Sequence, residues 1–224
     1  MSLLLELQNI HKHYQLGEKT IQVINGISLK VNHGDFLAVM GTSGSGKSTL
    51  MYILGSLVSP DTGAYFLQDR EMLSLDDAGK SWVRANWLGF VFQTFHLLPE
   101  LTVFDNVALP FLYKKVDPRT KKERILRAIQ RVGLEHRRQH RPAELSGGEM
   151  QRAAIARALV VEPLLILADE PTGNLDSQNS QEILDLFAEL NQTGSTIIMV
   201  THDPQVAATA DMTLHMKDGI LYNS

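Results

Sequence analysis

The sequence contains no cysteine among its 224 residues, so disulfides and thiolate chemistry are both excluded. This fits a reducing compartment. Positive charge is not in excess either, because the formal net charge is −4 and the isoelectric point is about 6.1. Phosphate backbones and anionic lipid surfaces attract proteins that carry a dense Lys and Arg surface. The composition therefore argues against a nucleic-acid binder and against a protein held at a membrane by charge alone.

Long apolar runs are also missing. The short run at residues 3–5 is cut by Glu6 and follows no basic segment, so we expect no signal peptide. Elsewhere the best apolar stretch, ALVVEPLLILA, is interrupted by Glu162 and Pro163 and falls far short of the ~20 residues that a membrane span requires. We therefore expect a soluble, cytoplasmic chain.

The chain begins with a β-rich section. Apolar and polar residues alternate over residues 3–7, 21–24 and 27–31, which predicts short antiparallel strands. The continuous apolar run at 35–40 then predicts a strand covered on both faces, followed by a glycine loop and a helix that reaches Leu54.

Further buried strands and helices alternate after that loop. Apolar runs at 164–168 and 196–200 predict two more buried strands, and the apolar spacing over 176–190 predicts a helix between them. This alternation is typical of an α/β fold with a parallel sheet, whose sites lie at the carboxyl ends of the strands.

The middle of the chain has helical patterns instead. Helices are predicted over 102–112 and 118–132, within a helical subdomain at about 95–160. We expect a single domain over 1–224, with its core in 1–94 and 161–224. The basic cluster EHRRQHR at 135–141 is interpreted as a solvated connector rather than a nucleic-acid contact, because four of its seven residues are neither Lys nor Arg and no aromatic residue interrupts it.

The stretch GTSGSGKS at residues 41–48 fits the phosphate-binding pattern G-x-x-x-x-G-K-[ST] between a strand and a helix. Its glycines let backbone N–H groups point at a phosphate, and the helix start adds positive charge. Lys47 is expected to neutralise the β- and γ-phosphates, the Ser48 hydroxyl to bind Mg²⁺, and Thr49 to donate to the α-phosphate. The nucleotide contacts predicted here are Gly41, Thr42, Ser43, Gly44, Ser45, Gly46, Lys47, Ser48 and Thr49.

Two acids end the strand at 164–168. Adjacent strand residues point to opposite sides, so we expect different roles for them. Asp169 would face Mg²⁺ through a water, and Glu170 would polarise the attacking water as a general base. The alternative is that both acids only cap the turn at Pro171.

Three further residues have two interpretations each. Gln93 follows the apolar run 88–92 and is either a metal or water contact or a plain strand end. His202 follows the run 196–200 on the same expected sheet edge, and is either structural or functional. Tyr14 is either a core residue or a surface on which adenine stacks.

The stretch LSGGEMQR at 145–152 opens a helix about 100 residues after the phosphate loop. Ser146 as an ordinary N-cap explains the serine but not the adjacent Gly147 and Gly148, because glycines in a first helical turn weaken the helix. The pair allows close backbone approach of another group, and Ser146 adds a hydroxyl at a positive helix end.

These stretches, with LLILADEPTGNLD at 164–176, together resemble the nucleotide-binding subunits of ATP-binding cassette (ABC) transporters over essentially all 224 residues. The resemblance implies an ABC-type P-loop core with an N-terminal antiparallel β section and an inserted helical subdomain. It also implies ATP and Mg²⁺ as ligands, and a head-to-tail homodimer with two ATP sites. The resemblance also implies a role for each of several residues. Ser146, Gly147 and Gly148 would contact the γ-phosphate across the dimer, and Asp176 would link the two sites. Tyr14 would stack on adenine, Gln93 would sense the nucleotide and contact the metal, and His202 would contact the γ-phosphate.

Longer stretches resemble one branch of that family. FQTFHLLPELTVFDNVALP and EHRRQHRPAELSGGEMQRAAIARAL are similar to the branch with the LolD-type lipoprotein-releasing subunits and the MacB-type exporters. This implies an ATP-hydrolysing subunit at the inner face of the cell membrane, which drives a separate permease through a groove after Gln93. Glu149 stands where the signature often has Gln.

Two functions other than transport are alternatives. One is a soluble cassette that acts on chromosomes, on ribosomes or in iron–sulfur assembly. The chromosome type would carry a long coiled coil and the translation type a second cassette, and neither feature is present in these 224 residues. A nucleotide-binding module without catalysis would lack Lys47, Glu170 or His202, and all three are present.

Overall fold

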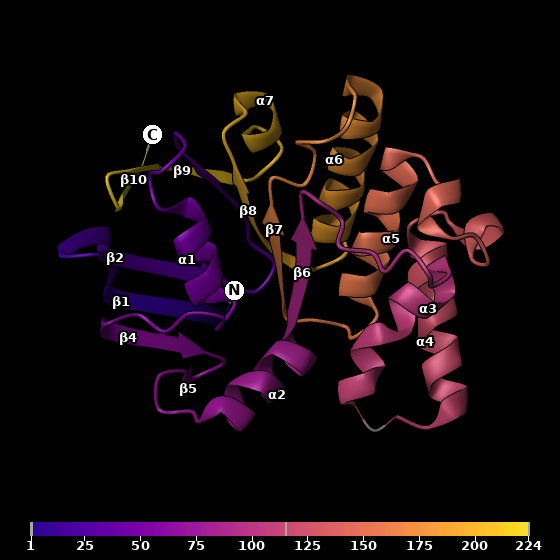
Figure 1. Ribbon diagram of the computed structural model, residues 1–224, viewed down its shortest axis with the longest axis horizontal. Helices are drawn as coiled ribbons and strands as arrows, with labels where there is room; N and C mark the ends of the chain where they lie inside the picture. The colour runs from indigo at the N-terminus through magenta and orange to yellow at the C-terminus, as the bar shows by residue number, and fades with distance from the viewer. Residues whose placement is uncertain (1, 115, 224) are drawn as a thin grey trace.

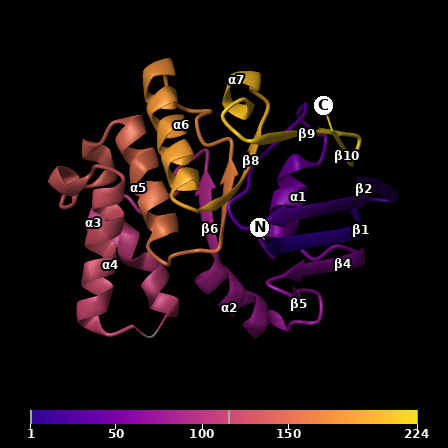
Figure 2. The ribbon, with the colours of Figure 1, turned by 180° about the vertical axis from the view of Figure 1, so that it is seen from behind.

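The computed structural model describes residues 2–114 and 116–223, and this part of the chain forms two sheets and a set of helices. In Figure 1 the N-terminal sheet lies on the left, the larger sheet crosses the middle, and helices α3 to α6 gather on the right. Figure 2 shows the same parts from behind, with the helices still on the side away from the N-terminal sheet. The larger sheet therefore separates the N-terminal sheet and helix α1 from helices α3 to α6.

The N-terminal sheet is antiparallel and has the strand order β2-β1-β4-β5. The stretches 21–24 and 27–31, predicted as separate strands, belong to one long strand, which pairs along its length with the first strand of the chain. The β section was thus predicted correctly in kind and underestimated in length. Its strands are β1 (Leu3–Leu16), β2 (Lys19–Asn32), β4 (Thr62–Leu67) and β5 (Arg70–Glu71).

The larger sheet has the strand order β10-β9-β3-β8-β7-β6, and only the pair β9–β10 is antiparallel. The three buried strands predicted from sequence are neighbours at its centre. A backbone hydrogen bond from Asn25 N to Gly219 O (2.8 Å) joins the two sheets. The strands of the larger sheet are β3 (Phe36–Met40), β6 (Leu88–Phe92), β7 (Leu165–Asp169), β8 (Thr196–Thr201), β9 (Met212–Lys217) and β10 (Ile220–Asn223).

The central strands are covered on both faces, as their continuous apolar sequences predict. Leu165 and Leu167 of β7 pack into the core shared with α1 and the N-terminal sheet. Ile166 and Ala168 of the same strand pack into the core shared with α5 and α6. One strand therefore contributes to both cores by simple alternation.

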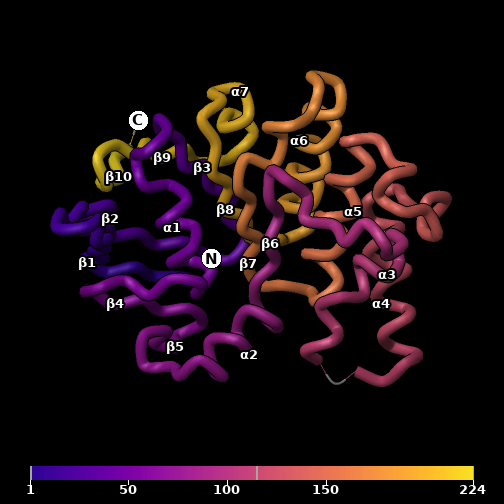
Figure 3. The backbone as a smooth tube through the Cα atoms, viewed as in Figure 1, coloured from indigo at the N-terminus to yellow at the C-terminus, as the bar shows by residue number. Residues whose placement is uncertain are grey.

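Helices α3 to α6 lie on the side of the larger sheet that faces away from the N-terminal sheet. The tube in Figure 3 leaves β6, runs across to α3, and returns through α4 and α5 before β7 begins. This is the inserted helical subdomain predicted for residues 95–160. The helices are α1 (Lys47–Leu54), α2 (Asp77–Trp87), α3 (Val103–Ala108), α4 (Pro118–Arg131), α5 (Gly147–Leu159), α6 (Ser177–Gln192) and α7 (Pro204–Ala207), with 3₁₀ turns at Leu109–Tyr113, Glu135–Arg137 and Pro142–Glu144.

The helix predicted over 102–112 is divided in two. Thr102 caps α3 by accepting a hydrogen bond from Asp105 N, and the chain tightens into a 3₁₀ turn that contains Pro110. Asn106, which is fully buried, accepts from Leu98 N (2.8 Å) and donates back to Leu98 O (3.1 Å). This side chain fixes the loop that follows β6 against the helical subdomain.

Candidate active site

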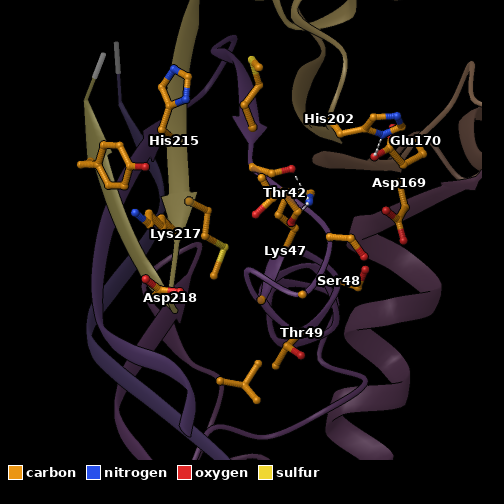
Figure 4. A pocket seen from close by; sticks show the side chains of 18 of the residues that line it. Thr42, Lys47, Ser48, Thr49, Asp169, Glu170, His202, His215, Lys217 and Asp218 are labelled. Atoms are coloured by element: carbon orange, nitrogen blue, oxygen red, sulfur yellow. Dashed lines mark hydrogen bonds and ion pairs between the residues drawn. The ribbon is translucent and has the colours of Figure 1, made fainter.

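A cavity of about 1190 Å³ opens at the carboxyl ends of β3, β7 and β8 and contains most of the residues predicted to bind nucleotide. Figure 4 shows side chains from the phosphate loop on one side and from the ends of β7 and β8 on the other. The predicted residues on its wall are Gly41, Thr42, Ser43, Gly44, Gly46, Lys47, Ser48, Thr49, Gln93, Asp169, Glu170 and His202.

The phosphate loop is closed around Lys47. The Lys47 side chain is buried, and its Nζ donates to Gly41 O (2.7 Å) and Thr42 O (2.9 Å). Helix α1 begins at this residue, directly after Gly46, whose φ is 105°. A Cβ on Gly46 would lie 2.7 Å from Val23 O, so both the backbone angle and the space require glycine. A helix start and a cation therefore face the cavity together, which suits a phosphate.

Ser45 is the exception among the predicted loop residues. Its side chain is buried, its Oγ has no hydrogen-bond partner in the described structure, and its N–H donates to Thr42 O (3.2 Å) within the turn. Ser45 is not among the described residues that line the cavity. The Ser45 side chain therefore fills the inside of the loop, and the nucleotide contact predicted for this residue stays a prediction.

Asp169 and Glu170 both line the cavity, although adjacent strand residues were expected to point to opposite sides. Asp169 is the last residue of β7, and Glu170 has a φ of 45°, in the left-handed region. The strand alternation ends there, so the second acid turns toward the same space. Burial, with a smaller contribution from the Glu170 charge, raises the pKa of Asp169, and nearby Lys47 opposes that shift.

The Glu170 carboxylate is fixed through both oxygens. His202 Nδ1 lies 2.7 Å from Glu170 Oε1, and Thr201 Oγ1 donates to Glu170 Oε2 (3.1 Å). Both partners come from β8 or the residue after it, whereas Glu170 follows β7. In Figure 4 the His202 and Glu170 side chains meet at the edge of the cavity. This arrangement orients a carboxylate as a general base requires.

Gln93 joins two loops at the cavity. Its Nε2 donates to Asn174 Oδ1 (3.2 Å), and its backbone carbonyl accepts from Asn174 Nδ2 (3.0 Å). Gln151, which the sequence argument did not single out, is fully buried in α5 and donates to Pro171 O (2.6 Å). The segment after Glu170 is thus connected both to the end of β6 and to the helix that Ser146 opens.

Tyr14 is not among the described residues on the cavity wall. It lies on β1 opposite Ile21, is 40% exposed, and has Lys12 Nζ at 5.5 Å from its ring centre. The core alternative for Tyr14 is wrong because its side chain is exposed, and stacking of this ring on adenine stays a prediction. Two other aromatic rings on the wall, those of His215 and Tyr222, are stacked with their centres 5.9 Å apart.

Ser146, Gly147, Gly148 and Asp176 are likewise absent from the described residues of that wall. Ser146 caps α5 in a reciprocal pair: its Oγ accepts from Glu149 N (3.2 Å), and Glu149 Oε2 accepts from Ser146 N (2.8 Å). Asp176 caps α6 by accepting from Asn179 N (2.9 Å). The N-cap interpretation is therefore correct for Ser146 within one chain, and Asp176 is an N-cap that the sequence argument did not consider.

Gly148 has a packing reason inside the chain that the sequence did not reveal. A Cβ at this position would lie 2.1 Å from Oδ1 of Asn179 at the start of α6. A Cβ on Gly147 would meet Leu175 Cδ2 at 3.2 Å, which is tight but flexible. Close approach of α5 and α6 thus explains one glycine of the pair, and the exposed Ser146 beside it stays accessible.

A groove of about 570 Å³ lies between α2, β6 and the helical subdomain, next to the segment that follows Gln93. Arg157 donates from Nη2 to Phe95 O (2.6 Å) and from Nη1 to His96 O. Both of these residues have positive φ, 57° and 50°. The guanidinium holds a strained turn on the groove wall. The groove wall includes Phe90, His96, Tyr113 and Arg157.

The oxygen donors predicted for Mg²⁺ share the cavity. Ser48, Gln93 and Asp169 all line it, and Figure 4 shows Ser48 and Asp169 facing the same space. Among residues 2–114 and 116–223, no group of three or more His, Cys, Asp or Glu side chains could hold a metal ion. Two or three protein oxygens fit Mg²⁺, which usually completes its shell with phosphate oxygens and water.

No helix in the described part of the chain is long and apolar enough to cross a membrane. The ABC transporter family model matches residues 24–173. The chain is 51% identical over 218 residues to the ABC transporter ATP-binding protein YvrO of Bacillus subtilis, covering 97% of this chain and 95% of the relative. It is 45% identical over 225 residues to the lipoprotein-releasing system ATP-binding protein LolD of Acinetobacter baylyi, covering 97% and 96%.

The chain also matches part of a longer protein and a solved structure. It is 48% identical over 218 residues to the macrolide export ATP-binding/permease protein MacB of Chlorobium luteolum, covering 97% of this chain but only 33% of MacB. The dimeric post-hydrolysis structure of the ATP-binding cassette MJ0796 with ADP and Pi superimposes with a TM-score of 0.88, at 38% identity and 98% coverage of both chains. The predicted ABC-type fold is confirmed, and the chain belongs to the ABC transporter family as an ATP-binding, ATP-hydrolysing subunit.

Proposed function

We propose that two copies of this chain form a head-to-tail dimer with two ATP sites and drive a separate membrane permease. One observation carries the proposal. Lys47 and Glu170 line the cavity, but Ser146 at the start of α5 in the same chain is not among the described residues on the cavity wall. A second copy supplies the missing half of each site. The dimeric form of the MJ0796 cassette supports this arrangement.

In this mechanism Lys47 exchanges the carbonyls of Gly41 and Thr42 for the β- and γ-phosphates, helped by the start of α1. The oxygens of Ser48, Gln93 and Asp169 would hold Mg²⁺, which would neutralise phosphate charge when bound. The remaining contacts of the nucleotide come from the phosphate loop through Thr49.

Glu170 accepts the proton of the attacking water, since its carboxylate is already oriented by His202 and Thr201. His202 contacts the γ-phosphate, and Ser146, Gly147 and Gly148 of the second copy contact it from the opposite side. Asp176 connects the two sites across the dimer. Tyr14 stacks on adenine once the β1–β2 hairpin moves toward the cavity.

The permease binds in the groove beside α2. Its wall includes Phe90, His96 and Tyr113, and it adjoins the segment after Gln93, so groove and nucleotide cavity share one loop. Tyr113 is 82% exposed, which leaves an aromatic ring at the groove rim for a partner to cover. The chain thereby acts at the inner face of the cell membrane through its permease.

The transported molecule is inferred from the relatives. LolD is named for lipoprotein release and MacB for macrolide export, and both match nearly the whole of this chain. We place the system in that branch, with either lipoprotein release or MacB-like export. A cassette ATPase without a permease is the alternative function.

The test is capture of partners by a tagged Glu170→Gln chain from detergent-solubilised host membranes in the presence of ATP. A permease with few membrane spans and a large extracytoplasmic domain is the expected partner. A many-span importer permease would overturn the branch, and purely soluble partners would overturn transport. A second variant, Tyr113→Ala, tests the groove. This exposed side chain can be removed without disturbing the core, so the variant should capture less permease while its ATP binding stays intact.

A further inference from the structure

The signature stretch of this chain carries a negative charge at a place where the proposed function needs to attract a phosphate. Glu149 lies in the first turn of α5, three residues after Ser146. Hydrogen bonding from Ser146 N and the neighbouring Arg137 lower the pKa of Glu149, so the side chain is ionised at neutral pH. A carboxylate there cancels much of the positive end of the helix and repels a γ-phosphate brought by a second copy.

Arg137 is placed to remove that repulsion. Its Nε donates to Glu149 Oε1 (2.8 Å), while the other carboxylate oxygen, Oε2, accepts from Ser146 N (2.8 Å). Both side chains are partly shielded, with 35% of Arg137 and 22% of Glu149 exposed, so solvent screens the pair less than it screens a fully exposed ion pair.

The turn that carries Arg137 is itself anchored. The backbone carbonyl of Arg137 accepts a hydrogen bond from His140 N (2.8 Å), and His140 O accepts one from Val103 N (2.9 Å) at the start of α3. Arg137 Nη1 also lies 3.3 Å from His140 Nε2. These contacts fix the Arg137 guanidinium beside Glu149 in the helical subdomain.

The capping pair also decides which donors remain for a phosphate. Ser146 N is used by Glu149, and Ser146 Oγ accepts from Glu149 N, so the serine hydroxyl hydrogen can point outward. The N–H groups of Gly147 and Gly148 lie in the first turn, where α-helices leave donors unpaired. A fixed Glu149 keeps these donors directed at the same point.

We propose that Arg137 is a positioning residue of the signature stretch: it neutralises Glu149 and holds that carboxylate on Ser146 N, so that the start of α5 can bind the γ-phosphate held by the other copy. This inference rests on the proposed head-to-tail dimer. It assigns a role in the site to a residue of the cluster 135–141, which the sequence suggested was only a solvated connector.

The experiment measures the dimer dissociation constant by sedimentation velocity with ATP and Mg²⁺, with every variant built on Glu170→Gln. Arg137→Ala should weaken the dimer by about tenfold, the size expected for an uncompensated charge in a first helical turn. Adding Glu149→Gln to Arg137→Ala should restore dimerisation to within about threefold, because Gln keeps the cap and lacks the charge. Higher salt should shrink the Arg137→Ala defect.

The controls separate charge from structure. Arg138→Ala removes the exposed neighbouring guanidinium and should leave the dimer unchanged. Arg137→Lys, which keeps a cation, should lie between the parent and Arg137→Ala. Binding of a fluorescent ATP analogue to the monomer, on its own phosphate loop, should be the same in all variants, which shows that they are folded.

The outcomes are distinguishable. Unchanged dimerisation of Arg137→Ala, or failure of Glu149→Gln to rescue it, overturns the role of Arg137 while leaving the dimer in place. A Glu170→Gln parent that stays monomeric with ATP overturns the proposed function and this inference together.

Discussion

His202 Nδ1 lies 2.7 Å from Glu170 Oε1, across the gap between the ends of β8 and β7. The pair depends on the positive φ of Glu170, because a continued strand would turn that carboxylate away from the cavity. Backbone strain at this residue thus brings a base and its orienting partner into one site.

We expect Glu170→Gln to reduce steady-state ATP hydrolysis by at least about 100-fold, the usual contribution of a positioned general base. The amide keeps the shape and can still bond to Thr201 and His202, so the ATP-bound dimer should accumulate. Phosphate release and gel filtration with ATP measure the two effects. Near-normal hydrolysis would exclude Glu170 as the base.

The role of the orienting residue is tested separately. His202→Ala removes one of the two contacts of the carboxylate and should lower kcat by about tenfold or more, within the range for acid–base partners. Thr201→Val removes the other contact, the weaker one at 3.1 Å, and should lower kcat less. An equal loss in both variants would indicate that His202 only orients Glu170 and has no phosphate contact.

Gly148→Ala should destabilise the isolated chain by about 1–3 kcal/mol, as overpacking usually does. The added Cβ would lie 2.1 Å from Asn179 Oδ1, where α5 and α6 meet. The double variant with Asn179→Ala should recover most of the free energy of unfolding in urea. Gly147→Ala is the matched control and should cost less, since its Cβ meets only a flexible Leu175 methyl. A larger cost for Gly147→Ala would contradict this account.

The central strands and the phosphate loop could be predicted because their signals are local. The apolar run at 164–168 and the spacing of Gly41, Gly46 and Lys47 need no knowledge of the rest of the chain. Helix α2 carries no such signal, since Val83 is its one fully buried residue among mostly polar neighbours, and it was not predicted.

The features of the site that could not be predicted depend on local backbone geometry and on contacts between residues distant in the sequence. The opposite-sides argument for Asp169 and Glu170 assumed a regular strand, and the strained turn after β7 breaks that regularity. The packing role of Gly148 could not be predicted because Asn179 lies 31 positions later in the sequence, and the contact of the glycine pair with a second copy stays a prediction. Side-chain burial such as that of Ser45 depends in the same way on the folded loop.

Arg157→Lys should uncouple the groove from the nucleotide cavity. The guanidinium holds the carbonyls of Phe95 and His96, two residues at positive φ, and a lysine can bond to only one of them well. We expect basal ATP hydrolysis to stay near normal while stimulation by the permease falls. Hydrolysis by the chain with and without its purified permease measures this, and unchanged stimulation would contradict it.

Asp169→Asn should raise the thermal stability of the nucleotide-free chain at neutral pH while abolishing hydrolysis. Because burial raises the pKa of Asp169 in the folded state above its ordinary 3.8, the folded chain binds more protons than the unfolded chain between the two values. Stability is therefore lost as pH rises through that window, and above it the ionised carboxylate costs stability that the amide does not. The gain in Tm should shrink as pH is lowered toward 3.8, because the acid then becomes protonated as well. A lower Tm for Asp169→Asn at neutral pH would show that Lys47 outweighs burial at this position and that the carboxylate stabilises the empty site.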